Sequence, residues 1–128
     1  MGNILRYKLK LPKCKIADVN KFMVVDFIDA VKDCFKQNDF GGTGDSGAIG
    51  GSFLVGYKNH LFHIDEDYQV AVPKENYYCV GSGANFAFGA MYAANEYSGD
   101  PKEIITVALE AASTYAMGVS EPFTIIHS

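Results

Sequence analysis

The residues of this sequence best suited to binding or catalysis are Gly81, Ser82 and Gly83, which follow one another in the chain. The apolar stretch 77–80 before them predicts a strand, and the small residues of 84–96 after them predict a helix. Glycines between a strand and a helix N-terminus expose backbone N–H groups, and Ser82 adds a hydroxyl group in the same place. The spacing fits an anion-binding or catalytic turn and a tight strand-to-helix connection, and taken alone it favours the tight connection.

The glycine-rich stretch 42–47, Gly-Thr-Gly-Asp-Ser-Gly, matches two motifs by spacing but neither by context. A dinucleotide-binding loop follows a strand and begins a helix, whereas this stretch follows a predicted helix and precedes predicted strands. Its last four residues are similar to the nucleophile segment of chymotrypsin-like proteases, yet no histidine precedes Ser46 to serve as the base. We therefore expect a flexible surface loop here, and the sequence predicts no cofactor.

The side chains that most often bind metals do not have the spacing of a metal site. His60 and His63 are three residues apart, so in a regular strand they point to opposite faces and cannot bind the same ion. The acidic run 65–67 is interpreted as solvated. The cysteines are odd in number and widely spaced, which is typical of neither a disulfide framework nor a paired-cysteine site: Cys14, Cys34 and Cys79. The sequence therefore predicts no metal site.

The length of 128 residues and the apolar content of 48% predict one folded domain over residues 1–128. No apolar run approaches the roughly 20 residues that span a bilayer. The first residues also lack the basic and apolar regions of a signal peptide. We therefore expect a cytoplasmic protein that does not bind a membrane.

Charge is unevenly distributed along the chain. Residues 1–21 hold six basic side chains against the single acidic Asp18, whereas the remainder holds five basic and fourteen acidic side chains. A basic start attracts phosphate, but this one contains a single arginine, and the acidic remainder repels a polyanion. The sequence therefore does not predict nucleic-acid binding.

The hydrophobic periodicity predicts an α+β protein. Its expected parts are a basic arm or the end of a first helix over 1–17, a helix over 18–37, a Gly-rich loop over 38–51, antiparallel strands over 52–81, helices over 83–98 and 101–117, and a strand over 121–127. Within the helix over 18–37, apolar residues recur at spacings of three and four and predict one buried face: Val24, Phe27, Ile28, Val31 and Phe35.

Turn and cap residues support several of these boundaries. Lys58-Asn59 separates the strands 53–57 and 60–64, and because asparagine tolerates a positive φ, a two-residue hairpin turn is expected there. Further strands are expected over 68–72 and 77–80. Asp100, Pro101 and Glu103 have the order of an N-cap, a first-turn proline and a capping-box glutamate. The helix that follows is expected to pack through Ile104, Ile105, Ala108, Ala111, Ala112 and Tyr115, and to end before Gly118.

The stretch from Tyr77 to Ala90 reads Tyr-Tyr-Cys-Val-Gly-Ser-Gly-Ala-Asn-Phe-Ala-Phe-Gly-Ala. Placed after the predicted hairpin and before the helix at Asp100, it resembles proteasome β subunits and their bacterial relative, a proteasome-like peptidase partnered by an ATP-dependent unfoldase. The resemblance extends from Asp18 to His127. It implies the layered αββα fold of the N-terminal-nucleophile hydrolases, with a threonine-type peptidase as the parent enzyme.

In that family the nucleophile is an N-terminal threonine, serine or cysteine, whose own α-amine acts as the general base. The chain instead begins Met1-Gly2-Asn3, and residues 1–11 would align with the family's first helix. The resemblance therefore implies the C-terminal portion of such a protein, without the first strands of the fold. We expect this portion to be inactive alone because it lacks the nucleophile.

The resemblance also assigns roles to residues of the site. Ser82 matches the serine whose hydroxyl supports the N-terminal amine, which implies an auxiliary catalytic role, and Ser120 approximately matches a second serine in the loop after the last long helix. Gly81 and Gly83 are expected to contact substrate. Met117 stands near the position where proteasome subunits carry an aspartate, so that part of the network differs.

Absence of the first strands would leave one face of the sheet uncovered, and exposed apolar surface drives self-association. We therefore expect a homo-oligomer, and an ATP-dependent unfoldase as a partner of the full-length parent. Two alternatives remain open from the sequence. One is a non-catalytic assembly or binding module of the same fold, and the other is an unrelated small-ligand enzyme that uses a pocket beside Ser82.

Overall fold

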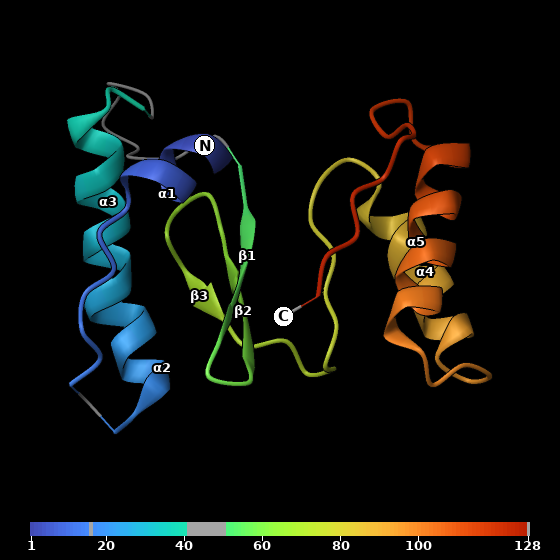
Figure 1. Cartoon of the computed structure of the whole chain (residues 1–128), viewed down its shortest axis with the longest axis horizontal. Helices are drawn as coiled ribbons and strands as arrows, with labels where there is room; N and C mark the ends of the chain where they lie inside the picture. Colours follow the sequence, from blue (N-terminus) through green and yellow to red (C-terminus); the bar gives the residue numbers. More distant parts are fainter. Residues whose placement is uncertain (16, 41–50, 128) are drawn as a thin grey trace. The chain divides into compact units, whose positions relative to one another are not determined.

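The computed structural model describes residues 1–15, 17–40 and 51–127 (Figure 1). They form an α+β fold, as predicted, in two compact units, Met1–Asn76 and Tyr77–Ser128. A single domain over 1–128 stays a prediction. The glycine-rich motif at 42–47, with Ser46, lies outside the described residues. No described helix combines the length and the apolar character that a membrane crossing requires.

The first unit combines helices with a small antiparallel sheet of order β1-β2-β3 (Figure 1). Its elements in chain order are α1 (Gly2–Lys8), α2 (Val19–Phe22), the π-helical turn η1 (Met23–Phe27), α3 (Ile28–Gln37), β1 (Phe53–Tyr57), β2 (His60–Ile64) and β3 (Val70–Ala71). Residues 1–17, expected to form a basic arm or the end of a helix, include the short helix α1.

The helix predicted over 18–37 forms, but η1 interrupts its α-helical hydrogen bonding. Asp18 is the N-cap, because its side chain accepts a hydrogen bond from the Lys21 backbone N–H at 3.1 Å. The π-helical turn adds a residue to the helical repeat and so rotates the residues before it relative to those after it. The placement of Val24 on the buried face is therefore wrong, since its side chain is 54% exposed while Met23 is buried. The other four predicted core positions are buried.

The predicted hairpin forms with the expected two-residue turn. Tyr57 pairs with His60, and the register continues to the pair of Phe53 with Ile64. Lys58 and Asn59 have φ angles of +47° and +61°, which are the two consecutive positive φ values of a type I′ turn. The turn matches the right-handed twist of the strands it joins.

The third strand is shorter than the predicted 68–72. Tyr68 has a φ of +67°, and its backbone N–H donates to the Asp65 carbonyl at 3.0 Å, so residues 65–68 form a turn. The Asp67 carboxylate accepts a hydrogen bond from the Gln69 backbone N–H at 3.0 Å. The strand therefore begins only at Val70.

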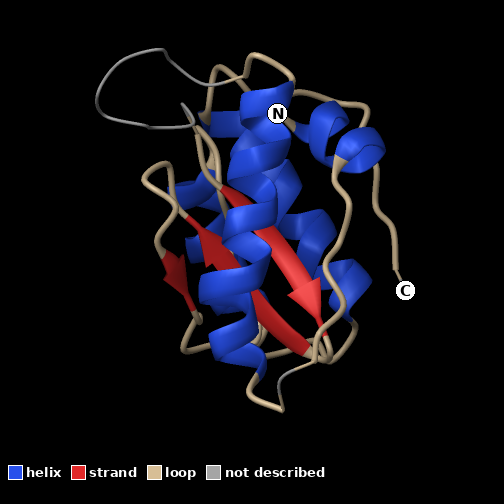
Figure 2. Cartoon of the chain, turned by 90° about the vertical axis from the view of Figure 1, so that its left-hand side faces the viewer, coloured by secondary structure: helices blue, strands red, loops and turns tan. Residues whose placement is uncertain are grey.

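The core of the first unit lies between the continuous helical segment α2-η1-α3 and one face of the sheet. This helical segment crosses the strands (Figure 2). Its fully buried side chains are Phe22, Met23, Val31, Phe35, Phe62 and Ile64. Burial of a large apolar side chain contributes about 1.5 to 3 kcal/mol. Since these residues come from both the helix and the hairpin, their contacts hold the two together.

The second unit is built on two helices, α4 (Ala84–Ala94) and α5 (Pro101–Tyr115). Asp100 is the N-cap of α5, and its carboxylate accepts a hydrogen bond from the Lys102 backbone N–H at 3.0 Å. Glu103 is part of the cap through Ser98. The Ser98 hydroxyl donates to the Glu103 carboxylate and accepts from the Asp100 backbone N–H. The predicted start of α5 is confirmed, and Ser98 adds a hydrogen-bonded link between Glu103 and Asp100.

The helices α4 and α5 pack through small side chains. Three further predictions for the second unit differ from the structure. Ile104, Ala108 and Ala112 are buried, but Tyr115 at the end of the same face is 70% exposed. Residues 77–80 and 121–127 were expected to be strands, yet neither segment has strand hydrogen bonding. A strand requires a partner strand, and the described elements of this unit are helices.

The positive φ of Asn59 gives a test of the hairpin. Asn59→Val should lower the free energy of unfolding by about 1 to 2 kcal/mol, because a β-branched residue is strained in the left-handed region. Asn59→Gly is the matched control and should retain or increase stability. Urea denaturation followed by circular dichroism measures both, and equal stability of the two variants would contradict the turn geometry.

Candidate functional site

The candidate site begins at the turn that leads into α4. Gly81 has a φ of +104°, a conformation that strains every residue other than glycine. Its carbonyl accepts a hydrogen bond from the Ala84 backbone N–H at 3.1 Å, and Gly83 follows as the N-cap of α4. The turn places Ser82 at the helix N-terminus with its side chain exposed.

Gly83 is buried against α5 and the loop that follows it. A Cβ atom on Gly83 would lie 2.8 Å from the Ala112 Cβ and 2.8 Å from the Val119 Cγ2. Atoms in real structures do not approach so closely, so the backbone of α4 reaches α5 only because this residue lacks a side chain. The glycines of the motif therefore have structural reasons of their own: Gly81 for its φ angle and Gly83 for close packing.

The Ser82 hydroxyl lies against Gly118, in the loop that follows α5. A Cβ atom on Gly118 would be 2.8 Å from the Ser82 Oγ, so a side chain there would displace the serine. The Val119 backbone N–H donates to the Ala116 carbonyl at 3.3 Å and closes the turn that carries Gly118. The sequence indicated Gly118 only as the end of a helix. Its contact with Ser82 joins residues 36 positions apart, and no local signal reveals it.

Ser120 belongs to the same loop and is exposed. The structure thus brings Ser82 close to the loop that contains Ser120, but neither hydroxyl forms a hydrogen bond with another described residue. Met117, which also follows α5, is fully exposed at 108%. The site as described supplies the hydroxyl groups of Ser82 and Ser120, and Glu121 is the next residue of the same loop.

Cys79, just before the turn, is a second nucleophile type in the neighbourhood. Its thiol lies 3.4 Å from the Met91 sulfur, and burial raises the pKa of Cys79 above its usual value. A raised pKa keeps the thiol protonated near neutral pH, whereas a nucleophilic cysteine needs a lowered one. Cys79 is therefore a packing residue of the second unit.

The histidines and acidic residues of the hairpin do not assemble into a metal site. The Nδ1–H of His60 donates a hydrogen bond to the Lys58 carbonyl oxygen at 2.8 Å. The carboxylates of Asp65 and Asp67 accept hydrogen bonds from neighbouring backbone N–H groups. Within the described parts of the chain, no three His, Cys, Asp or Glu side chains gather as metal ligands do.

The arrangement of elements is similar to that of solved structures of the bacterial proteasome homologue BPH from Thiobacillus denitrificans. One BPH structure matches with a TM-score of 0.66 and 20% sequence identity, over 84% of this chain and 57% of the BPH chain. The chain has the fold of part of BPH. A second structure, BPH in complex with Epoxomicin, matches with a TM-score of 0.64 at the same identity and coverage.

No protein-family model and no curated protein sequence matches the chain. The likeness to BPH is therefore a likeness of fold, and it confirms the resemblance inferred from the Gly81 to Ala90 motif. The match covers 57% of the BPH chain, so this chain spans little more than half the length of BPH. The roles of Ser82, Ser120, Gly81 and Gly83 stay predictions.

The contact of Gly83 with α5 predicts opposite effects for two glycine substitutions. Gly83→Ala should lower the free energy of unfolding by about 1 to 3 kcal/mol, because its methyl group would overlap Ala112 and Val119. Gly89→Ala on α4 is the matched control. A Cβ atom there has nothing within 4 Å, and the helix should gain about 0.5 to 1 kcal/mol. Thermal denaturation of both variants measures the effect, and a stable Gly83→Ala protein would refute the close approach.

Proposed function

We propose that residues 1–128 are part of a proteasome-like N-terminal-nucleophile hydrolase with αββα layers, whose complete form hydrolyses peptide bonds. The observation that carries this proposal is the fold likeness to BPH over 84% of the chain. The position of Ser82, at a helix N-terminus and against the loop after α5, supports it. Under this proposal, residues 1–128 contribute supporting residues of the site rather than the nucleophile, so we expect no hydrolysis from these residues alone.

In the proposed reaction, an N-terminal threonine, serine or cysteine outside residues 1–128 attacks the peptide carbonyl, and its α-amine takes the proton. The contribution of this chain is the Ser82 hydroxyl, which hydrogen-bonds to that amine and orients it. The backbone N–H groups of the 81–83 turn are available to substrate. Ser120 acts from the neighbouring loop in a lesser auxiliary role.

A second candidate is a non-catalytic assembly or binding module of the same fold. The observation that favours it is the composition of the site, since the exposed Met117 lies where the family's aspartate is expected. In this case Ser82 and Gly118 would serve only to pack the turn against the loop. The two candidates share the fold and differ in their response to a peptidase assay.

The test uses two proteins, the 128-residue chain and the whole product of the reading frame that contains it. The chain alone should show no hydrolysis of a fluorogenic peptide and no Epoxomicin adduct by intact mass spectrometry. The whole product should hydrolyse the peptide, and Ser82→Ala should reduce kcat/KM at least about tenfold, the value of one hydrogen bond to a charged group.

Ser113→Ala is the matched control for this experiment. The Ser113 hydroxyl donates to the Glu110 carbonyl within α5 at 3.0 Å, so its removal should leave kcat/KM unchanged. Absence of turnover in the whole product would eliminate the peptidase proposal in favour of the binding module. Equal losses in the two serine variants would eliminate the auxiliary role of Ser82.

The proposed protein is a cytoplasmic homo-oligomer, and an ATP-dependent unfoldase is the proposed partner of its complete form. The second unit exposes several large apolar side chains, and their burial between chains would favour self-association: Phe86, Tyr92, Tyr97, Tyr115, Met117 and Ile126.

Light scattering tests the oligomer directly. The expected mass is a multiple of the 14.0 kDa chain, because association removes this apolar surface from water. A mass of 14.0 kDa that stays constant over a wide range of protein concentration would exclude the homo-oligomer.

A further inference from the structure

β1 lies at one edge of the three-stranded sheet of the first unit, with β2 as its neighbour (Figure 1). Its residues, Phe53–Tyr57, include no charged side chain and no proline, and they pair with β2 without a bulge. Natural sheets usually protect an edge strand with charges, proline or a bulge, because an open edge pairs readily with another chain. β1 has none of these protections along its length.

The hairpin register determines which backbone groups of β1 point outward. In a two-residue hairpin, the residues that flank the turn form a hydrogen-bonded pair, and such pairs alternate along the strands with pairs that are not hydrogen-bonded. Tyr57 and His60 flank the turn, so every second residue from Tyr57 back to Phe53 directs its N–H and C=O groups toward β2. The N–H and C=O groups of Leu54 and Gly56 therefore point to the outer edge.

Further observations agree with this alternation. The Asp65 backbone N–H donates to the Gln69 carbonyl at 2.9 Å, on the β3 side of β2. The odd separation of Asp65 from His60 requires that direction, because successive residues of a central strand face opposite neighbours. Among the described residues, no backbone hydrogen bond outside the hairpin reaches Leu54 or Gly56. Gly56 is exposed, and a Cβ atom there would have nothing within 4 Å.

We propose that β1 pairs with β1 of a second copy of the chain, antiparallel and around a two-fold axis that passes between the two Val55 residues. In this register Leu54 of each copy lies opposite Gly56 of the other. Each of these pairs exchanges both of its N–H···O hydrogen bonds, so the outward groups of both residues are satisfied in both copies. The contact rests on the proposed homo-oligomer and names a surface that forms it.

The strand itself favours a second copy as the occupant of this edge. A two-fold contact must be self-complementary, and β1 meets this condition in its backbone groups. Because residues 51–57 are uncharged, two antiparallel copies bring no like charges opposite each other within this stretch. Leu54 lies opposite a glycine, whose missing side chain leaves space for it. These matches are matches of β1 with itself, so they favour a second copy over an unrelated strand.

Disulfide trapping tests the register. Val55→Cys places thiols on both sides of the two-fold axis, where the Cα atoms of a pair that is not hydrogen-bonded are about 4.5 Å apart, within the range of a disulfide. Mild oxidation should convert most of this variant to a covalent dimer linked through residue 55, as mapped by peptide mass spectrometry. Leu54→Cys is the matched control. Its two thiols occupy diagonal positions about 7 to 8 Å apart and should form little covalent dimer.

The unsubstituted chain, which contains Cys14, Cys34 and Cys79, gives the background of this experiment. A charge on the edge then tests the contact without cysteine chemistry. Gly56→Lys has space for its side chain and should weaken self-association at least about tenfold by light scattering, because its ammonium group would lie in the contact. Gln37→Lys adds the same charge at an exposed position on α3 and should leave association unchanged.

Hydrogen exchange of the unsubstituted chain tests for other occupants. The amides of Leu54 and Gly56 should become more protected as the protein concentration rises. Protection that does not depend on concentration would assign the edge to another segment of the same chain and overturn the proposal. Absence of the disulfide at residue 55, or equal association of Gly56→Lys and Gln37→Lys, also overturns it, provided circular dichroism shows the variants folded. An oligomer without this disulfide would leave the homo-oligomer in place and remove only the β1 contact, whereas a monomer at every concentration would remove both.

Discussion

The second unit depends on the close approach of Gly83 to α5. Because this residue has no side chain, the first turn of α4 lies directly on Ala112 and Val119. The approach continues along the two helices through Ala87, Ala108 and other small buried residues. Small side chains offer little apolar area each, so the helices gain stability from closeness and dispersion contacts rather than from large buried groups.

This packing also determines where Ser82 lies. The positive φ of Gly81 turns the chain, Gly83 fixes the start of α4, and Gly118 leaves space for the hydroxyl between them. Three glycines in two distant segments are thus required to place the side chain of Ser82. The serine has a defined position, and its hydroxyl forms no hydrogen bond with another described residue. Its chemistry, in the proposed function, comes from the group that it supports.

The features that local sequence determines could be predicted. The hairpin turn could be predicted because Asn59 tolerates a positive φ, and the start of α5 because Asp100 and its neighbours form a cap. Most of the buried face of the helix over 18–37 also follows from periodicity, because four of the five expected positions are buried. The motif at Gly81 to Ala90 predicted the likeness of fold to BPH, and two of its glycines are explained by a positive φ and by close packing.

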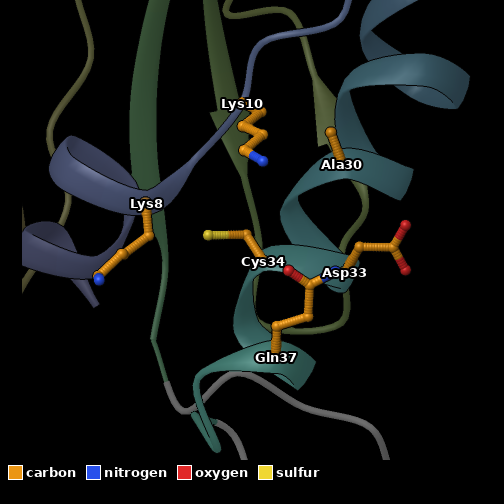
Figure 3. A pocket seen from close by; sticks show the side chains of 6 residues that line it. All are labelled: Lys8, Lys10, Ala30, Asp33, Cys34 and Gln37. Carbon is orange, nitrogen blue, oxygen red and sulfur yellow. The ribbon is translucent and has the colours of Figure 1, made fainter.

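The features that could not be predicted depend on distant parts of the chain. The apolar segments 77–80 and 121–127 have the composition of strands, but a ladder needs a partner, and composition does not supply one. The contact of Ser82 with Gly118 joins the two ends of the second unit's helical pair. The shallow pocket lined by Lys10 and Cys34 (Figure 3) likewise arises from segments that are distant in sequence and meet only in the fold.

The π-helical turn η1 has a consequence for the comparison of sequences. A π turn accommodates one residue more than the α-helix on either side of it. A relative with an uninterrupted α-helix would therefore align correctly with α2 and α3 only if a one-residue gap is placed within Met23–Phe27. Without that gap, the exposed Val24 would be paired with a core position, and every residue before it would be out of register by one.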